Sequence, residues 1–287
     1  MARLFSARMT SLTSVQSRIK LTDGHTIPCV GFGVYNMRPG KETEQSALCA
    51  LKAGYRHLDT ANIYGNEKSV GDAIKKSGIP REELFVTTKL WDNMQGYDNA
   101  IKALESSLSK LGLDYVDLYL IHSPNPGKEK RLATWKAMEK LQRDGKIRSI
   151  GVSNYGVHHI QELPDNGYSL PAVNQIEITP YLARPKIVEY CQKHGIQIEA
   201  YSPLTMGTKL SDPKLKKIAD KYNQQPANIL IRWSVQHGYV PLPKSVTKER
   251  ILSNMDVFSF EISKEDMETL DGFDEHHVTE WDPTVSA

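Results

Sequence analysis

The amino-acid sequence predicts an α/β protein: a single (β/α)8 TIM barrel over residues 19–287, with an N-terminal β-hairpin and added loops and helices at the C-terminal end. Short apolar segments alternate with segments of helical periodicity, and eight such repeats are present. Their spacing suits the repeating unit of a parallel sheet, in which a strand, a helix and the connection to the next strand need about 30 residues. No linker or low-complexity break divides the series, so one barrel is expected rather than two domains.

The first predicted element is a hairpin over RIKLTDGHTI, in which Asp23 and Gly24 supply the turn. The barrel strands are then predicted at residues 28–33, 55–59, 84–89, 115–122, 148–154, 172–175, 196–202 and 239–245. Apolar residues between strands recur with a period of 3.6, which predicts helices. Two such helical faces are formed by Ile101, Leu104, Leu108 and Leu111, and by Leu132, Trp135, Met138 and Leu141.

Composition excludes several classes of protein. The formal net charge is +2, and the 36 basic residues are scattered among 34 acidic ones, so no nucleic-acid partner is expected. The apolar runs are too short to cross a membrane. The three cysteines, Cys29, Cys49 and Cys191, show neither a disulfide framework nor metal-ligand spacing, which is typical of a reducing compartment and predicts a cytoplasmic protein.

Residues 1–18 contain Arg and Ser but no acidic residue. We interpret them as a disordered N-terminal extension. The alternative, a mitochondrial targeting segment, has the same composition and is disfavoured only because short polar leaders are common.

Polar side chains follow the apolar runs where the predicted strands end. In a (β/α)8 barrel, the carboxyl ends of all strands meet at one mouth, where the site of chemistry is built. The sequence therefore predicts one shared site, to which seven strands contribute Asp59, Lys89, His122, Ser153, Asn154, Gln175, Ser202 and Lys244.

The stretch HLDTANIYGNE, residues 57–67, places Asp59 close to Tyr64. A tyrosine keeps its proton to a pH of about 10, and a nearby ammonium makes that proton easier to lose. Lys89 can supply the ammonium, and Asp59 can keep Lys89 charged. His122 can orient a carbonyl oxygen. Tyr64 is then predicted to be a general acid that protonates a developing alkoxide while a hydride arrives from another molecule.

These residues, in the contexts HLDTANIYGNE, VTTKLW and LYLIHSP, resemble the catalytic tetrad of the aldo-keto reductases. The segments IGVSN, NQIE, AYSPL and LPKSVTKER resemble the cofactor-binding segments of that family, in the same order. The resemblance implies a monomeric, NADPH-dependent reductase of small carbonyl compounds, with Asp59, Tyr64, Lys89 and His122 as catalytic residues.

The predicted cofactor site has physical reasons beside the resemblance. Ser153, Asn154 and Gln175 can recognise a carboxamide, and Tyr201 can stack on the nicotinamide. A strand end that leads into a helix carries two basic and two hydroxyl side chains, which suits a 2′-phosphate and predicts NADPH over NADH. The expected cofactor-binding residues are Gly33, Val34, Asp59, Ser153, Asn154, Gln175, Tyr201, Ser202, Pro203, Leu204, Lys244, Ser245, Val246, Thr247, Arg250 and Asn254.

The substrate is expected to lie among aromatic side chains. The predicted set is Tyr35, Tyr64, Trp91, His122 and Trp281. No metal is expected, because the adjacent pairs His158-His159 and His276-His277 diverge and lack partners at ligand spacing.

Two other functions share the same predicted fold. Lys89 could act as a Schiff-base nucleophile in a lyase, although a neighbouring Asp59 would keep it charged and poorly nucleophilic. The chain could also be a non-catalytic, cofactor-binding subunit. The intact set of four polar residues favours the reductase.

Overall fold

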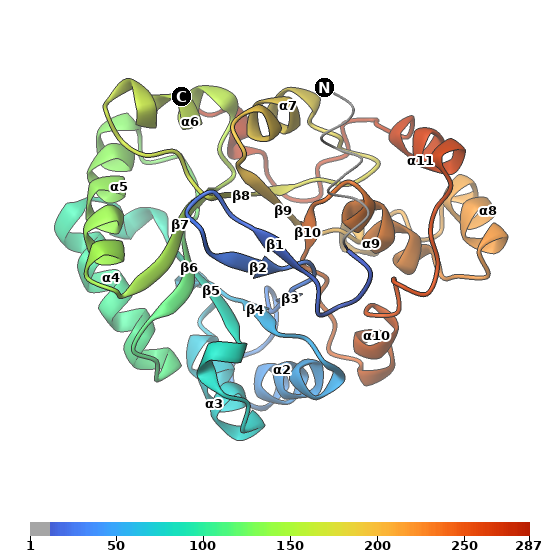
Figure 1. The fold of residues 1–287 in the computed structure, drawn as a ribbon, viewed down its shortest axis with the longest axis horizontal. Coiled ribbons are helices and arrows are strands. Elements are labelled where there is room, and N and C mark those ends of the chain that lie inside the picture. Colours follow the sequence, from blue (N-terminus) through green and yellow to red (C-terminus); the bar gives the residue numbers. More distant parts are fainter. Residues whose placement is uncertain (1–11) are drawn as a thin grey trace.

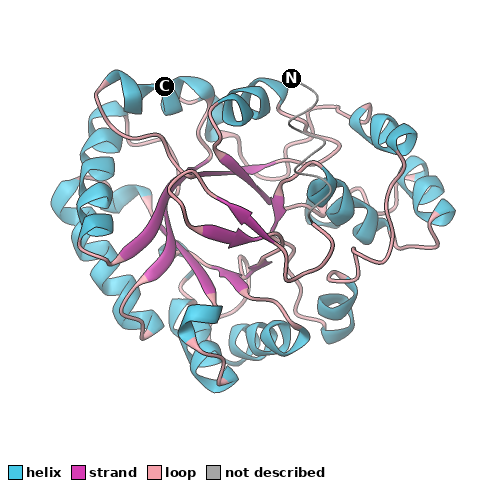
Figure 2. Cartoon of the chain, viewed as in Figure 1, coloured by secondary structure: helices cyan, strands magenta, loops and turns pink. Residues whose placement is uncertain are grey.

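The structure is a computed structural model that describes residues 12–287. Eight parallel strands pair in chain order, from β3 to β10, and helices surround them (Figure 1, Figure 2). Two backbone hydrogen bonds join the first strand to the last, from Gly31 N to Pro241 O at 3.0 Å and from Gly33 N to Pro243 O at 3.1 Å. The sheet is thereby closed, and the predicted (β/α)8 barrel is confirmed.

The strands lie close to their predicted positions. The hairpin is β1 (Arg18–Lys20) and β2 (Thr26–Pro28), and the barrel strands are β3 (Phe32–Gly33), β4 (His57–Asp59), β5 (Phe85–Leu90), β6 (Val116–Ile121), β7 (Ile147–Ser153), β8 (Val173–Glu177), β9 (Gln197–Tyr201) and β10 (Val240–Pro241). β3 and β10 are shorter than predicted. Residues 26–28 pair in the hairpin instead, and Pro241 and Pro243 have no N–H to donate to a longer ladder.

Helices follow the strands and cover the outside of the barrel. They are α2 (Lys41–Ala53), α3 (Glu67–Ser77), α4 (Tyr97–Leu111), α5 (Lys128–Arg143), α6 (Val157–Asp165), α7 (Pro185–Lys193), α8 (Pro213–Lys221), α9 (Pro226–Gln236), α10 (Lys248–Ser253) and α11 (Lys264–Asp271). The predicted apolar faces of α4 and α5 are turned inward, since Leu104 and Trp135 at their centres are fully buried. Among the described residues, no helix has the length and apolarity to span a bilayer.

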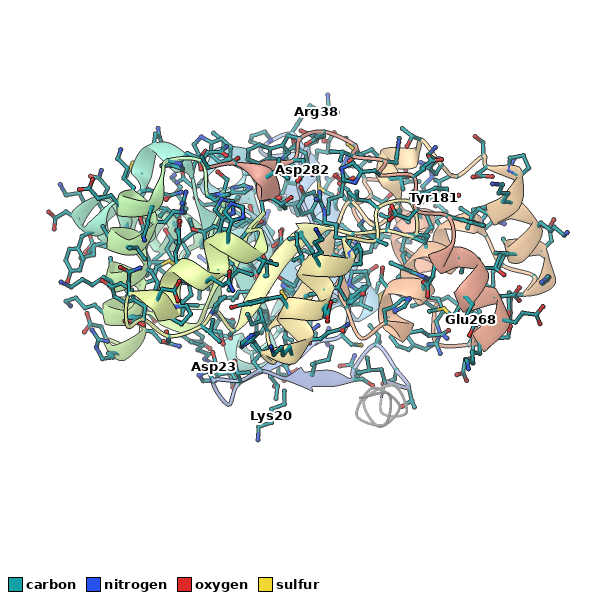
Figure 3. The ribbon with its side chains drawn as sticks, turned by 90° about the horizontal axis from the view of Figure 1, so that it is seen from above. Lys20, Asp23, Arg38, Tyr181, Glu268 and Asp282 are labelled. Carbon is teal, nitrogen blue, oxygen red and sulfur yellow. The ribbon has the colours of Figure 1, made fainter. Side chains whose placement is uncertain are left out.

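The hairpin lies at one end of the barrel and the strand mouth at the other. Figure 3 shows Lys20 and Asp23 of the hairpin at one end, and Arg38 and Asp282 at the opposite end. The predicted turn is confirmed, with Gly24 at a φ of 92° between the paired strands. The carboxyl end of the barrel is thus left open for a site.

Only part of the expected N-terminal extension is described. Leu12 is buried, Gln16 donates a hydrogen bond to Gly54 O at 3.4 Å, and Ser17 O accepts one from Cys29 N. Residues 12–17 therefore pack against the barrel rather than extending from it. Residues 1–11 lie outside the described part of the chain.

Candidate active site

A buried ion pair forms the floor of the site. Lys89 on β5 is fully buried, and its ammonium donates to Asp59 Oδ1 at 2.6 Å, to Thr60 O at 3.0 Å and to the Tyr64 hydroxyl oxygen at 3.4 Å. Asp59 ends β4, and Tyr64 ends the short 3-10 turn Asn62–Tyr64 that follows it. All three N–H groups of the ammonium are occupied, so Lys89 is fixed by three acceptors.

Tyr64 keeps its own proton available. Its oxygen accepts from Lys89, so its O–H can donate elsewhere. Burial raises the pKa of Tyr64 well above its usual value, and the Asp59 carboxylate raises it further. The expectation that Lys89 would lower this pKa is therefore not met. The reason is that burial penalises the phenolate while Asp59 offsets the charge of Lys89. Tyr64 is a neutral phenol at neutral pH.

His122 follows β6 and is also neutral. Burial lowers its pKa well below the usual value, and the Lys89 ammonium acts in the same direction. The ring meets Trp91 edge-on, with centroids 5.0 Å apart, and Tyr64 edge-on at 5.6 Å. A neutral imidazole has one donor and one acceptor nitrogen, so His122 can orient a carbonyl oxygen without carrying charge.

A cavity of about 360 Å³ opens above these residues. It brings together the predicted substrate residues, including Tyr35, Trp91 and Trp281, and adds two that the sequence analysis missed, Ile63 and Glu280. The lining residues are Tyr35, Ile63, Tyr64, Trp91, His122, Ser153, Asn154, Gln175, Tyr201, Glu280 and Trp281.

A second cavity, of about 680 Å³, adjoins the first at Tyr35, Tyr64, Gln175 and Tyr201. It contains the predicted cofactor residues Gly33, Asp59, Gln175, Tyr201, Ser202, Pro203, Leu204, Lys244, Ser245, Val246, Thr247, Arg250 and Asn254. Ser153 and Asn154 line the first cavity instead. Val34 lines neither; it is buried, and its carbonyl accepts a hydrogen bond from Asn66.

An amide network lies where the two cavities meet. The side-chain nitrogen of Gln175 donates to Asp59 Oδ2 and to Glu199 Oε2, each at 2.9 Å. Both of its N–H groups are thereby used, which leaves the Gln175 side-chain oxygen to accept from a ligand. Asn154 accepts from the Tyr201 hydroxyl at 2.8 Å, which fixes the ring that the sequence predicts as a stacking plate.

Glu199 was not identified from the sequence, although an acid inside the apolar run IQIEAYS was a visible signal. Its side chain is fully buried on β9, and burial with the nearby Asp59 carboxylate raises its pKa to about 8. Glu199 is therefore a neutral carboxyl group at neutral pH, which limits the negative charge beside Asp59.

Strained backbone lies at both cavities. Ser202, Thr205 and Met206, after β9, have φ values of 45°, 52° and 50°, and Asn154 after β7 has a φ of 63°. Non-glycine residues rarely adopt this region, and such strain concentrates at functional sites. Here it shapes the loop that lines the cavity with Ser202, Pro203 and Leu204.

The C-terminal segment, residues 279–287, is fastened to strand and helix ends at the mouth. Arg184, before α7, donates to Asp282 Oδ2 at 2.9 Å and to Thr284 Oγ1 at 3.0 Å. Thr279 N donates to the buried Glu177 carboxylate. These contacts hold Glu280 and Trp281 at the first cavity.

The expectation that His158 and His159 diverge is wrong. Their rings lie 3.8 Å apart between centroids, and both contact the Ser286 carbonyl through Nε2, at 2.8 and 2.9 Å, because the C-terminal segment packs against the start of α6. His277 hydrogen-bonds Thr208. Within residues 12–287, no group of three or more His, Cys, Asp or Glu side chains is arranged to hold a metal ion.

Comparisons with known proteins agree with this geometry. Residues 31–275 match the profile of the Aldo/keto reductase family. The chain is 49% identical over 259 residues to a glyoxal reductase of Bacillus subtilis, covering 90% of this chain and 93% of that protein. It is 44% identical over 268 residues to a 9,11-endoperoxide prostaglandin H2 reductase of Trypanosoma cruzi. That match covers 92% of this chain and 94% of the other protein.

Solved structures show the same fold. An aldo/keto reductase of Brucella melitensis superposes with a TM-score of 0.88 at 44% identity, covering 91% of this chain and 99% of that one. An aldo-keto reductase of Bombyx mori, solved in complex with NADP, has a TM-score of 0.86 at 38% identity. That match covers 91% of this chain and 94% of the other. On these matches, the chain belongs to the aldo/keto reductase family.

Proposed function

We propose that this protein reduces aldehydes and ketones to alcohols with NADPH, and that Tyr64 is the general acid. The observation that carries the proposal is the position of the Tyr64 hydroxyl, which accepts from the Lys89 ammonium at 3.4 Å and lies at the junction of the two cavities. Its own proton is free to be donated into the cavity. NADPH, when bound, would supply the hydride.

The other residues of the site support the proton transfer. As negative charge develops on a carbonyl oxygen, neutral Tyr64 and neutral His122 can each donate a hydrogen bond to it. The Lys89 ammonium then stabilises the phenolate that remains after Tyr64 gives up its proton, and Asp59 fixes Lys89. Aromatic side chains on both sides exclude water from the reacting oxygen.

The second cavity fits a dinucleotide phosphate. Lys244 and Arg250 carry positive charge at one end of it, and Ser245 and Thr247 add hydroxyl groups. Gln175 offers a side-chain oxygen at the other end, suited to the amide N–H of a nicotinamide. These residues would hold the cofactor and support a preference for NADPH over NADH.

The structure gives no support to the lyase alternative. A Schiff-base lysine must present an uncharged, accessible amine. Lys89 is fully buried, ion-paired with Asp59 at 2.6 Å, and donates all three of its N–H groups. The arrangement suits a fixed charge rather than a nucleophile.

The decisive experiment compares the wild-type protein with Tyr64→Phe. The wild type should oxidise NADPH in the presence of methylglyoxal or a similar reactive aldehyde, followed by loss of nicotinamide absorbance. Tyr64→Phe should lower kcat by about 10² to 10⁴, the value of a positioned acid, and leave NADPH binding unchanged.

The matched control is Tyr190→Phe, which removes a hydroxyl on α7 that lines neither cavity. It should keep wild-type turnover. Undiminished turnover in Tyr64→Phe would rule out the proposed role, and no NADPH oxidation by the wild type with any carbonyl compound would refute the reductase itself.

A further inference from the structure

The charge of the first cavity is set by one residue, Glu280. The other ten lining residues are aromatic, apolar or neutral and polar, and His122 among them is uncharged because burial and Lys89 lower its pKa. No lysine or arginine is present in the lining. A substrate held there meets a carboxylate and has no cation with which to pair.

Contacts with neighbouring side chains hold the Glu280 carboxylate at the wall of the first cavity. Its Oε1 accepts from the Tyr35 hydroxyl at 3.2 Å, and the Tyr35 ring packs on the Tyr64 ring with centroids 5.0 Å apart. The neighbouring Trp281 packs against Trp91, with centroids 6.0 Å apart, and Asp282 is paired with Arg184. Contacts on both sides of Glu280 therefore keep its carboxylate in the cavity wall, with the Tyr35 ring between it and Tyr64, while the residue stays exposed to solvent.

The two buried cations near the walls of this cavity are each paired with a carboxylate. Lys89 lies beneath Tyr64 and is neutralised by Asp59, and Arg184 is neutralised by Asp282. Asp92, which follows Trp91, adds a further acidic group near this wall. The surroundings of the substrate are thus neutral to negative.

We propose that Glu280 determines substrate specificity by charge, so that the site takes neutral or cationic carbonyl compounds and discriminates against those that bear a carboxylate. The inference rests on the proposed reductase function and narrows its substrate class. A carboxylate on the substrate would lie near Glu280 with no partner, and like charges in a partly enclosed site repel. A hydroxyl or ammonium group on the substrate can instead donate to Glu280.

The test compares two aldehydes of nearly the same shape, 4-oxobutanoate and its methyl ester, with NADPH as the reductant. The measured quantity is the ratio of kcat/KM for the ester to kcat/KM for the acid. The wild type should favour the ester by about tenfold or more. Glu280→Gln should lower this ratio by roughly three- to tenfold, mainly through a lower KM for the acid, and Glu280→Lys should lower it further.

Two controls separate charge from structure. Glu268→Gln makes the same change in net charge on the exposed surface of α11, away from Asp282 and the mouth (Figure 3), and should leave the ratio as in the wild type. Tyr35→Phe removes the hydrogen bond to Glu280 but keeps the carboxylate, so it should shift the ratio less than Glu280→Gln. Raising the salt concentration should reduce the wild-type ratio but not that of Glu280→Gln.

Two results would overturn the inference: a wild-type preference for the acid, or an unchanged ratio in Glu280→Gln. If the ratio stayed unchanged while kcat/KM changed by the same factor for both aldehydes, Glu280 would have only a structural role. If the wild type reduced neither aldehyde nor any other carbonyl compound with NADPH, the proposed function would fail instead, and the two failures are distinguishable.

Discussion

At the scale of single residues, the site depends on charges that have been removed from water. Lys89 and Asp59 are buried together, and each needs the other because an isolated buried charge is very unfavourable. Tyr64 and His122 are held in their neutral forms by the same burial. In the proposed reaction, the chemistry therefore begins from two neutral hydrogen-bond donors above one compensated ion pair.

The first residue-scale prediction concerns the stability of that pair. Lys89→Met should lower the free energy of unfolding by about 3–5 kcal/mol, because Asp59 would keep a buried charge without a cation to compensate it. Urea denaturation measures the change. The control is Lys68→Met, which breaks an exposed pair with Asp72 on α3 and should have no measurable effect. Equal losses in the two variants would contradict this account.

The second residue-scale prediction concerns the stability of the folded protein at acidic pH. Burial, with Lys89 and Arg18, lowers the pKa of His57 to about 3, against about 6.5 in an unfolded chain. Between these values the unfolded chain binds a proton that the folded chain does not, so the contribution of His57 to stability falls as the pH drops from 6.5 towards 3. Glu199, whose pKa is raised to about 8, contributes with the opposite sign above its unfolded pKa. His57→Asn should reduce this slope by about 1.4 kcal/mol per pH unit.

Urea denaturation at several pH values between 4 and 7 checks the slope. The exposed His25 on the hairpin provides the control, since His25→Asn should leave the slope unchanged. An unaltered slope in His57→Asn would show that another group is responsible for the acid sensitivity.

At the scale of elements, loops held by strand and helix ends build the walls of the site. Each parallel strand delivers one or two side chains to the mouth, as Asp59 does from β4 and Lys89 from β5. The C-terminal segment adds Glu280 and Trp281, and it is held in place by Glu177 at the end of β8 and Arg184 before α7, among other contacts. Its position is therefore a property of several elements together.

The element-scale prediction is that Arg184→Met loosens the C-terminal segment. The side chain donates to Glu177 O, Asp282 and Thr284, so its loss should raise KM for an aldehyde about five- to tenfold, which corresponds to about 1 to 1.5 kcal/mol of lost positioning. Carboxypeptidase should also remove the last residues faster. Lys186→Met, at an exposed position of α7, is the control. An unchanged KM would separate this segment from substrate binding.

At the scale of the whole molecule, the two ends of the barrel differ in what they hold. The hairpin lies at one end (Figure 3), and the two cavities are lined by residues that follow the carboxyl ends of the strands. The larger cavity spans loops that follow β3, β9 and β10, which are distant in sequence. A ligand bound across them should stabilise the whole fold, because the unfolded chain has no such site.

The whole-molecule prediction follows from that linkage. At 100 times its Kd, NADPH should raise the free energy of unfolding by about 2.7 kcal/mol and shift the Tm upward. Lys244→Ala should weaken NADPH binding by about tenfold and NADH binding little, since only NADPH carries the 2′-phosphate. Lys248→Ala, which removes a neighbouring charge outside the cavity, is the control. Equal losses of affinity for NADPH and NADH would show that Lys244 does not bind the 2′-phosphate.

Much of the fold could be predicted because it depends on local patterns. The alternation of apolar runs and helical periods located the barrel strands to within a few residues, and Asp23-Gly24 fixed the hairpin turn. The errors have local causes as well. β10 ends early because Pro241 and Pro243 cannot donate hydrogen bonds, and proline was not weighed in predicting residues 239–245.

The sequence by itself determined which side chains at the strand ends reach the mouth of the barrel, since the end of a parallel strand is visible in its pattern, but not those that loops and the C-terminal segment add, such as Ile63 and Glu280. Only the tertiary structure decided what they meet there. Tyr35 and Glu280 are 245 residues apart yet share a hydrogen bond, and Glu199 reaches Asp59 through Gln175. The charge states follow from the same contacts. The pKa of Tyr64 is raised because its burial outweighs the effect of the Lys89 ammonium, whose charge Asp59 offsets. Burial exists only in the folded chain.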